Sequence, residues 1–276
     1  MPAQPAAARA SETTAPVLLR ERDGSIAILV LNRPQARNSL SETLLNELST
    51  AFAEIANDKT IRVVVLAANG PAFCAGHDLK ELTARRGDAD CGRNYFHHIM
   101  TTCSAMMQQI VNLPQPVIAA VQGVASAAGC QLVASCDLAI ASSAAKFATP
   151  GVNIGLFCST PMVALSRNVA RKAAMEMLLT GEMVMAEQAA AIGLINRVVA
   201  PGEERKSALA LAKEIAAKSS YVLKIGKQAF YRQAELGLAE AYGYASEVMT
   251  KNLLARDAEE GICAFIDKRD PSWEDR

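Results

Sequence analysis

The sequence of 276 residues lacks an excess of either charge. Lys and Arg together number 28, and so do Asp and Glu, which makes the formal net charge zero. A neutral chain has no general attraction for nucleic-acid phosphates or for anionic lipid surfaces, so we expect neither a nucleic acid nor a membrane as its partner. Because 51% of the residues are hydrophobic and only 20% are charged, the composition also excludes a disordered protein. A small ligand at one local site is the expectation that remains.

Patterns that hold metals or build disulfide frameworks are also missing. The seven cysteines are an odd number, no two of them are spaced C-x-x-C, and only three histidines are present. This argues against a zinc site and against a disulfide framework, and it predicts reduced thiols in an intracellular protein.

No segment has the composition of a secretory signal or of a membrane span. Residues 117–136 carry no charge over a length that would cross a bilayer. However, the run contains Gln122, Gln131, two serines and two glycines, which is typical of the buried centre of a soluble domain. Residues 1–16 have no apolar stretch of the kind found in signal peptides, and we predict that they form a disordered tail.

Short apolar runs alternate with helical spacing, which predicts an α/β fold with both faces of the sheet covered. A further helix is expected to begin at a capping box, Ser39-x-x-Glu42. We expect strands at 26–31, 62–67, 117–121 and 137–141, and helices at 93–111 and 127–136. After residue 201 only helical patterns remain, at 203–219, 221–236, 238–254 and 259–268. The chain therefore divides into a tail (1–16), a core (17–200) and a helical C-terminal region (201–276).

Two glycine-containing turns, each directly after a predicted strand, carry the candidate chemistry. They read FCAGHDLKEL at 73–82 and GVASAAGCQ at 123–131. Small residues let a ligand approach the backbone, and a helix that begins there points free N–H groups at it. Two such turns side by side would aim two donors at one developing oxyanion. On the residues alone, simple reversal of the chain is the alternative.

The first turn resembles the A-G-x-D-[LI]-K-E signature of the crotonase, or enoyl-CoA hydratase/isomerase, superfamily. Further blocks are similar to that family in order and spacing, from about residue 17 to 274: LNRP at 31–34, CDLA at 136–139, TGE at 180–182 and AFIDKR at 264–269. The resemblance is particularly close to the mitochondrial enoyl-CoA hydratase domain-containing branch and its bacterial relatives. It implies a crotonase spiral of ββα units, a helical C-terminal region that forms a trimer or a dimer of trimers, and an acyl-CoA or enoyl-CoA thioester as ligand. Coenzyme A is then part of the substrate, and no cofactor is permanently bound.

The resemblance also assigns roles to individual residues. It implies an oxyanion hole made by the backbone N–H groups of His77 and Ala128. The positions that match coenzyme A contacts are Ala36, Arg37, Ala75 and Lys80, together with Phe265 and Lys268, which match residues that in relatives reach the adenine-phosphate end across a subunit boundary. On the residues alone, the two lysines are equally well explained as solvated surface charges.

The two glutamates with which a hydratase of this family activates water and delivers a proton are absent. Gln131 stands in G-C-Q-L where the family pattern has the first glutamate, and Gly151 follows Pro150 where the second is expected. The acid that some isomerases place a turn later matches Ser159. A positioned acid or base contributes about 10²–10⁴-fold, so we expect orthodox hydration to be weak or absent. A glutamine holds a water through its amide but cannot take its proton.

Few other side chains are candidates to replace those acids. His77 has an unperturbed pKa near 6.5, although the alternative is that only its N–H acts. Residues 158–160 form a polar cluster in which a thiol would need a depressed pKa, and a helix N-cap by Ser159 or Thr160 is the favoured alternative. Ordinary structural roles are the better explanation for the remaining candidates, His97, His98 and Asp137.

The sequence therefore predicts a family enzyme that binds an acyl-CoA thioester and polarises its carbonyl, with Gln131 and Ser159 as further catalytic candidates. Three alternatives stay open. They are a non-catalytic acyl-CoA binder that regulates lipid metabolism, a thioesterase- or decarboxylase-like activity, and RNA binding, which the zero net charge disfavours. The expected compartment is the cytoplasm in a bacterium or the mitochondrial matrix in a eukaryote.

Overall fold

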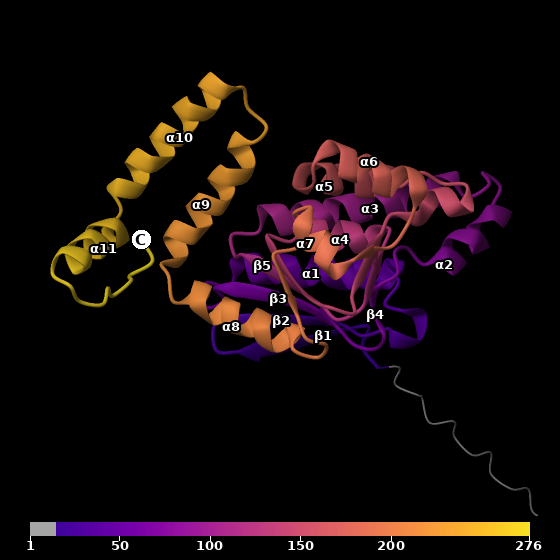
Figure 1. The fold of residues 1–276 in the computed structure, drawn as a ribbon, viewed down its shortest axis with the longest axis horizontal. Coiled ribbons are helices and arrows are strands. Elements are labelled where there is room, and N and C mark those ends of the chain that lie inside the picture. The colour runs from indigo at the N-terminus through magenta and orange to yellow at the C-terminus, as the bar shows by residue number, and fades with distance from the viewer. Residues whose placement is uncertain (1–14) are drawn as a thin grey trace, which may run out of the picture.

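Two sheets build the core of the computed structural model, which describes residues 15–276 (Figure 1). The tail predicted at 1–16 therefore falls almost entirely outside the described residues. The larger sheet has the order β1-β2-β3-β5-β7-β10, and the smaller has the order β4-β6-β8-β9. The strands of the larger sheet are β1 (Leu18–Asp23), β2 (Ile26–Leu31), β3 (Val63–Ala68), β5 (Val117–Val121), β7 (Leu138–Ser142) and β10 (Arg197–Val199). Those of the smaller sheet are β4 (Ala72–Cys74), β6 (Val124–Ser126), β8 (Lys146–Ala148) and β9 (Val184–Met185).

The chain winds through both sheets as a spiral. It passes from β3 to β4, from β5 to β6 and from β7 to β8, giving one strand to each sheet before it enters helices. Strands β2, β3, β5, β7 and β10 pair in parallel, and so do β4, β6 and β8. The helices of the core are α1 (Glu42–Asn57), α2 (Leu79–Ala84), α3 (Arg93–Asn112), α4 (Ala128–Ser135), α5 (Ser159–Asn168), α6 (Arg171–Thr180) and α7 (Ala186–Ala191). The predicted α/β class and the spiral of ββα units are confirmed.

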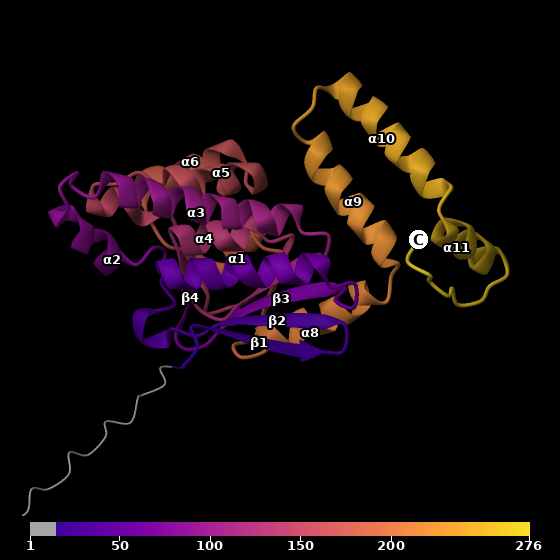
Figure 2. The same ribbon diagram turned by 180° about the vertical axis from the view of Figure 1, so that it is seen from behind.

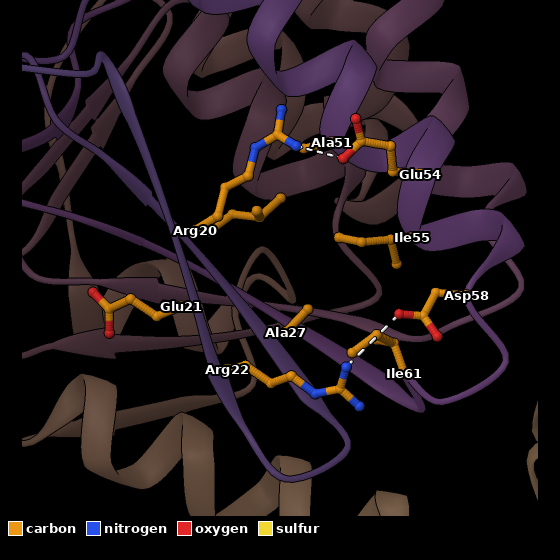
Figure 3. Close-up of a pocket in the computed structure, with 10 residues that line it drawn as sticks. Arg20, Glu21, Arg22, Ala27, Ala51, Glu54, Ile55, Asp58 and Ile61 are labelled. Carbon is orange, nitrogen blue, oxygen red and sulfur yellow. Dashed lines mark hydrogen bonds and ion pairs between the residues drawn. The ribbon is translucent and has the colours of Figure 1, made fainter.

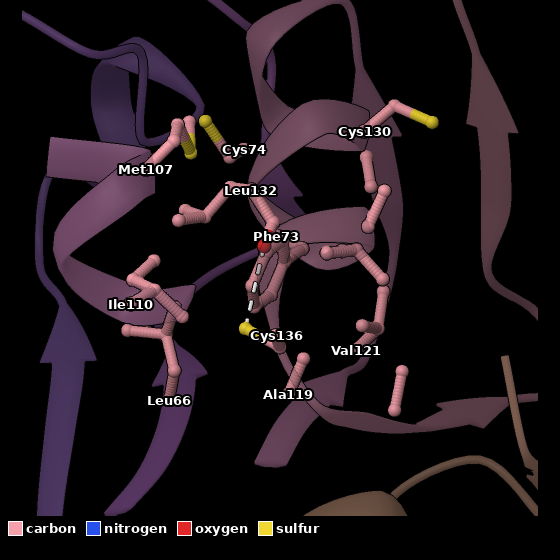
Figure 4. Packing of buried hydrophobic residues seen from close by; sticks show 14 of the residues in the cluster. Leu66, Phe73, Cys74, Met107, Ile110, Ala119, Val121, Cys130, Leu132 and Cys136 are labelled. Carbon is pink, nitrogen blue, oxygen red and sulfur yellow. Dashed lines mark hydrogen bonds between the residues drawn. The ribbon is translucent and has the colours of Figure 1, made fainter. Parts of the chain in front are cut away.

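The central strands are buried on both faces because their side chains alternate between two apolar layers. Leu29 and Leu66 belong to the layer that includes buried residues of α1, α3 and α4. Ile28 and Val65, one residue away in each strand, belong to the layer closed by α8 (Glu204–Ala216). Figure 4 shows the first layer, in which Phe73 lies among side chains of β3, β5, α3 and α4. This packing fixes the places where the strands end, and the two glycine-containing turns follow there.

The predicted strands and helices are confirmed, with their ends shifted by at most three residues. The structure adds strand β1, which pairs antiparallel with β2, as well as the short strands of the smaller sheet and helices α5 to α7. The capping-box prediction is wrong. Ser41, not Ser39, caps α1, because its hydroxyl accepts the N–H of Leu44 at 3.2 Å. The Ser39 hydroxyl instead donates to Asp78 at 3.2 Å, which ties it to the first glycine-containing turn.

Three helices at the C-terminal end form an arm that projects away from the sheets (Figures 1 and 2). They are α9 (Ser220–Gln233), α10 (Leu238–Leu253) and α11 (Arg256–Ile266). No residue of α9 or α10 is buried as a whole, although single side chains of α9 are, whereas α8 packs on the larger sheet. In the described part of the chain, no helix is both long enough and apolar enough to cross a membrane. The uncharged residues 117–136 form β5, β6 and α4 inside the core.

A largely buried ion pair attaches this arm to the core. The ammonium of Lys227 in α9 lies 2.7 Å from Asp137 Oδ2, and it also donates to the carbonyl oxygens of Ile110 (2.9 Å) and Gln115 (3.0 Å). Asp137 accepts a further bond from the Tyr231 hydroxyl at 3.0 Å. Burial lowers the pKa of Lys227, and the neighbouring Asp137 carboxylate opposes that effect. Because all three ammonium donors are used, the pair acts as an anchor, and the structural role expected for Asp137 is confirmed.

We expect Lys227→Met to lower the free energy of unfolding by about 3–5 kcal/mol, because it leaves the Asp137 carboxylate without its cation. Lys224→Met, an exposed position on the same helix, serves as the control and should change it by less than about 0.5 kcal/mol. Urea unfolding followed by circular dichroism at one protein concentration measures both. Equal midpoints for the two variants would contradict the anchoring role.

Candidate active site

The first glycine-containing turn leaves the backbone N–H of His77 unused among the described residues. Leu40 pairs with the turn on both sides of His77, because its N–H donates to Gly76 O at 2.8 Å and its carbonyl accepts the N–H of Asp78 at 3.1 Å. Arg33 holds the Asp78 carboxylate at 3.0 Å in a mostly buried ion pair. Across residues 15–276, the N–H of His77 has no hydrogen-bond partner. The turn is therefore rigidly fixed and presents a free donor.

The second turn presents another free donor at the start of a helix. Ala127 has φ 51° and ψ −117°, a conformation that costs a non-glycine residue of the order of 1–3 kcal/mol. Its N–H donates to Ala148 O at 2.9 Å, which fixes the turn to the end of β8. Ala128 is the first residue of α4, so its N–H has no acceptor in the helix, and it has no other among the described residues.

The two turns lie against each other. Gly76 has φ +95°, and a Cβ at this position would lie 3.0 Å from Ala127 Cβ and 3.5 Å from the nitrogen of Ala128. At Gly129 a Cβ would lie only 2.1 Å from Cys74 O, so α4 can approach β4 this closely only with glycine there. The free N–H groups of His77 and Ala128 are thereby neighbours. Such an arrangement can donate two hydrogen bonds to one oxygen atom and stabilise negative charge on it.

The imidazole of His77 is an uncharged group in this site. The residue as a whole is half-buried, but both ring nitrogens are buried and have no hydrogen-bond partner in the described structure. Burial lowers the pKa of His77 to about 4. The ring is therefore neutral near pH 7, with one nitrogen as donor and the other as acceptor. The other two histidines, His97 and His98, are exposed on α3, and His98 lies 3.2 Å from Glu42.

The space beside Gly151 is filled by a thiol. A Cβ on Gly151 would lie 3.0 Å from Cys158 Sγ and 3.0 Å from Leu156 O. A glutamate side chain at this position would therefore need the loop between these residues to move. Burial raises the pKa of the Cys158 thiol, and it raises that of Cys130 to about 12. These thiols are protonated at neutral pH, which contradicts a thiolate nucleophile in the 158–160 cluster.

The structure places the other catalytic candidates differently. Gln131 is buried in α4, and its Oε1 has no hydrogen-bond partner within residues 15–276. Ser159 is exposed, and its hydroxyl donates to Phe157 O at 3.3 Å. The N-cap expected from Ser159 or Thr160 is wrong, because α5 begins at Ser159 and its N-cap residue is Cys158, without a side-chain cap. No general base of the described chain hydrogen-bonds to Ser159.

The sequence analysis missed Thr149, which directly follows β8. Its side chain is fully buried, and its hydroxyl has no hydrogen-bond partner in the described residues. No sequence signal distinguishes this threonine from one in an ordinary turn, because only its burial and missing partner single it out. In the same part of the chain, no cluster of three or more His, Cys, Asp or Glu side chains is placed to hold a metal ion.

Four of the six positions matched to coenzyme A contacts lie in the first turn or next to it. Ala36 and Arg37 form the end of a short 3₁₀ turn, and the N–H of Ala75 donates to Arg37 O at 3.0 Å. Lys80 is exposed in the first turn of α2.

The other two positions lie far from this group. Phe265 is 85% exposed in α11, and Lys268 is exposed just beyond it. Figures 1 and 2 show α11 and α2 at opposite ends of the molecule. One chain therefore does not bring all six residues together.

A separate hollow of about 290 Å³ lies between β1, β2 and α1 (Figure 3). None of the residues that line it belongs to either turn. Its two guanidinium groups are already paired within the chain, Arg20 with Glu54 and Arg22 with Asp58. The hollow is therefore not part of the candidate active site.

Comparisons with known proteins agree with the fold and with the motifs. The family model for enoyl-CoA hydratase/isomerase matches residues 21–276. The human mitochondrial enoyl-CoA hydratase domain-containing protein 3 is 46% identical over 97% of this chain and 86% of its own length. A probable enoyl-CoA hydratase of Rhizobium meliloti is 34% identical over 94% of this chain and 98% of its own. A crystal structure of an enoyl-CoA hydratase from Mycobacterium smegmatis is 51% identical and superposes with a TM-score of 0.89, covering 94% of this chain and 99% of that one.

Protonation of His77 is expected to oppose folding. Its pKa is about 4 in the folded chain and near 6.5 in an unfolded one, so between these values the unfolded chain binds more protons and stability falls as the pH decreases. Between pH 7 and pH 5, the wild type should lose about 2 kcal/mol more unfolding free energy than His77→Gln. Urea unfolding at both pH values measures the difference. His97→Gln is the control and should keep the full wild-type loss, and an equal loss in His77→Gln would contradict the burial argument.

Proposed function

The chain belongs to the enoyl-CoA hydratase/isomerase family, and from this membership we propose that it binds acyl-CoA thioesters and polarises the thioester carbonyl. The N–H groups of His77 and Ala128 donate to the carbonyl oxygen. The observation that carries the proposal is that these two donors are free and adjacent, with Gly76 packed directly against Ala127 and Ala128. Donors fixed in advance stabilise an oxyanion by about 3–4 kcal/mol each, because they need no reorganisation when the charge develops.

Coenzyme A enters this proposal as a part of the substrate. Ala36, Arg37, Ala75 and Lys80 contact it on the chain that holds the thioester. The hydrogen bond between Ala75 and Arg37 supports this assignment, because it joins two of these positions beside the first turn. The exposed guanidinium of Arg37 and ammonium of Lys80 suit the phosphate groups of coenzyme A.

We further propose that orthodox hydration is weak or absent. Hydration needs a base for the incoming water and an acid for the α-carbon, and the two positions are occupied by Gln131 and Gly151. Neither His77, whose ring is neutral, nor Cys158, whose thiol is protonated, supplies the negative charge of the missing carboxylates. The chemistry that remains is stabilisation of an enolate, with the proton on the α-carbon lost slowly to solvent water or hydroxide and returned from it.

A thioester panel in deuterated water tests this function. Excess protein is incubated with saturated acyl-CoA and 2-enoyl-CoA thioesters, and mass spectrometry follows deuterium uptake, water addition and release of coenzyme A. We expect slow deuterium uptake at the α-carbon and little water addition in the wild type. Gln131→Glu restores one carboxylate and should raise the hydration rate by about 10²-fold. Gln131→Leu is the matched control without a carboxylate.

Other results of the same assay would contradict the proposal. Rapid hydration by the wild type would show that the missing glutamates are dispensable. Rapid release of free coenzyme A would favour a thioesterase. Saturable binding with no reaction of any thioester would favour the non-catalytic regulator.

We propose that the chain assembles as a trimer or a dimer of trimers through its C-terminal arm. The arm exposes large apolar side chains, including Leu238 at 78%, Leu254 at 82% and Phe265 at 85% exposure. An apolar surface of this kind is typical of an interface. Assembly would also let Phe265 and Lys268 of one copy reach the coenzyme A bound to another. The cytoplasm of a bacterium or the mitochondrial matrix of a eukaryote is the compartment we propose.

Sedimentation velocity tests the assembly. We expect a mass of three or six times the 29.3 kDa of one chain. Leu238→Glu/Leu254→Glu places charges in the apolar surface and should shift the mass toward a single chain. Lys251→Glu changes an exposed charge on α10 and is the control. A wild-type mass of one chain would rule out the proposed assembly.

A further inference from the structure

Residues 272–276 fold back onto the start of the arm, and we name them the C-terminal strap. The indole of Trp273 donates to Ala217 O at 2.9 Å, in the connection between α8 and α9. The carboxylate of Asp275 accepts the N–H of Ser220, the first residue of α9, at 2.8 Å. Figures 1 and 2 show the C-terminal end of the chain between this connection and α11. The strap therefore closes the arm at its base.

One residue of the core holds the strap and this connection together. Arg62, which directly precedes β3, donates to Ala216 O at 2.8 Å and to Lys218 O at 3.3 Å. The same side chain forms an ion pair with Asp275. Because one guanidinium binds both the end of α8 and the strap, the strap is fixed to the core as well as to the arm.

A buried carboxylate attaches α11 to the strap. Asp257 is 1% exposed, and it accepts the N–H groups of Glu274 at 2.7 Å and of Asp275 at 3.0 Å. It also accepts the hydroxyl of Ser219, which in turn caps α9 by accepting the N–H of Val222 at 3.2 Å. Hydrogen bonds to a carboxylate are stronger than those between neutral groups. Asp257 thus joins α11, the strap and the start of α9 at one point.

The indole of Trp273 also packs directly on α11. A Cβ at Gly261 would lie 3.2 Å from two carbon atoms of the ring. Glycine inside a helix is less stable than alanine, but at this position it lets the ring approach the helix. Since the same ring donates to Ala217, it bridges α11 and the connection between α8 and α9.

The turn that follows α11 is locked to the strap through one carboxylate. Arg269 binds both carboxylate oxygens of Glu260, at 2.6 Å and 2.9 Å, and the N–H of Ser272 donates to the same group at 2.8 Å. Lys268, directly before Arg269, has φ 54°, a left-handed conformation that persists in a non-glycine residue where its surroundings hold it. The backbone that carries Lys268 is therefore fixed, and so is the preceding turn of helix with Phe265.

We infer that the C-terminal strap positions Phe265 and Lys268 for the adenine-phosphate end of a coenzyme A thioester bound to a second copy. This inference rests on the proposed binding of acyl-CoA thioesters and on the proposed assembly. In the described chain, every side-chain hydrogen bond from α11 to another segment ends at Ser219, at Arg269 or in the strap. Without the strap, α11 would turn about residues 254–255, its short connection to α10, and the two contacts would leave the ligand.

Calorimetric titration of the full-length protein tests this positioning role. Butyryl-CoA is compared with S-butyryl-pantetheine, which keeps the thioester and lacks the adenine nucleotide. We expect Asp257→Asn and Trp273→Ala each to weaken the binding of butyryl-CoA about tenfold, because a misplaced α11 loses its contacts to the nucleotide. Neither variant should change the affinity for S-butyryl-pantetheine. Asp270→Asn, at an exposed position before the strap, is the control and should bind both ligands like the wild type.

A double-mutant cycle separates positioning from a general loss of structure. Phe265→Ala/Lys268→Ala removes the two contacts and should weaken the binding of butyryl-CoA to a similar extent. Adding Asp257→Asn to this variant should cause little further loss, because the strap acts through the same two side chains. Sedimentation velocity and thermal melting show whether each variant is assembled and folded. Trp273→Phe, which keeps an aromatic ring and loses the hydrogen bond, gives the same comparison if the alanine variant does not fold.

The outcomes distinguish this inference from the function on which it rests. If the wild type binds neither thioester, the proposed function fails and the inference fails with it. If the wild type binds both, and Asp257→Asn and Trp273→Ala bind butyryl-CoA equally tightly, the inference alone is overturned. Binding of thioesters by a wild type that sediments as a single chain would overturn it too. An equal loss for both thioesters, full additivity in the cycle, or dissociation of the variants into single chains would assign the strap a structural role instead and overturn the inference.

Discussion

The close approach of two backbone turns is the constraint on which the rest of this structure depends. Gly76 packs against Ala127 and Ala128, and glycine suits this position because its φ is +95° and a Cβ there would lie only 3.0 Å from Ala127 Cβ. The smaller sheet brings the turns together, because β4, β6 and β8 pair in parallel and two of them end at the turns. The strained backbone of Ala127 persists because β8 holds its N–H and α4 begins directly after it.

Two ion pairs fix the first turn and the C-terminal arm, whereas the segments around the second turn carry no charge. Arg33 and Asp78 fix the first turn, and Lys227 and Asp137 fix the arm to the segment between α4 and β7. The net charge of zero therefore hides an uneven arrangement, in which segments 123–136 and 147–166 contain no Asp, Glu, Lys or Arg. An uncharged region strengthens the effect of the oxyanion donors, because few competing charges and little water screen them.

The sequence predicted the strands and helices of the core better than the candidate site. Strands such as β2 and β5 are apolar on both faces, so their pattern alone reveals them. Strand β1 was not predicted because it reads LLRERD and lies at the edge of the sheet, with most of its side chains partly or fully exposed. The three-residue strands of the smaller sheet were not predicted because they are too short to show a period. Both oxyanion donors could be proposed because they lie on the backbone of a recognisable motif. The orphaned oxygen of Thr149, the buried ring of His77 and the thiol beside Gly151 depend on contacts between distant segments, which no local pattern contains.

Gln131 and Gly151 stand where the family pattern has two glutamates, and the packing around them bears on the proposed function. Cys158 fills the space beside Gly151, so the Cβ of any side chain at that position would lie 3.0 Å from the thiol sulfur and 3.0 Å from the carbonyl oxygen of Leu156. Gln131 keeps the length and hydrogen-bonding capacity of a glutamate while it removes the charge. Neither residue carries a negative charge that would repel the enolate of the proposed function. The proposed site, with two backbone donors and no carboxylate at positions 131 and 151, favours binding of a polarised thioester over activation of water, because no carboxylate at either position takes the proton of the water.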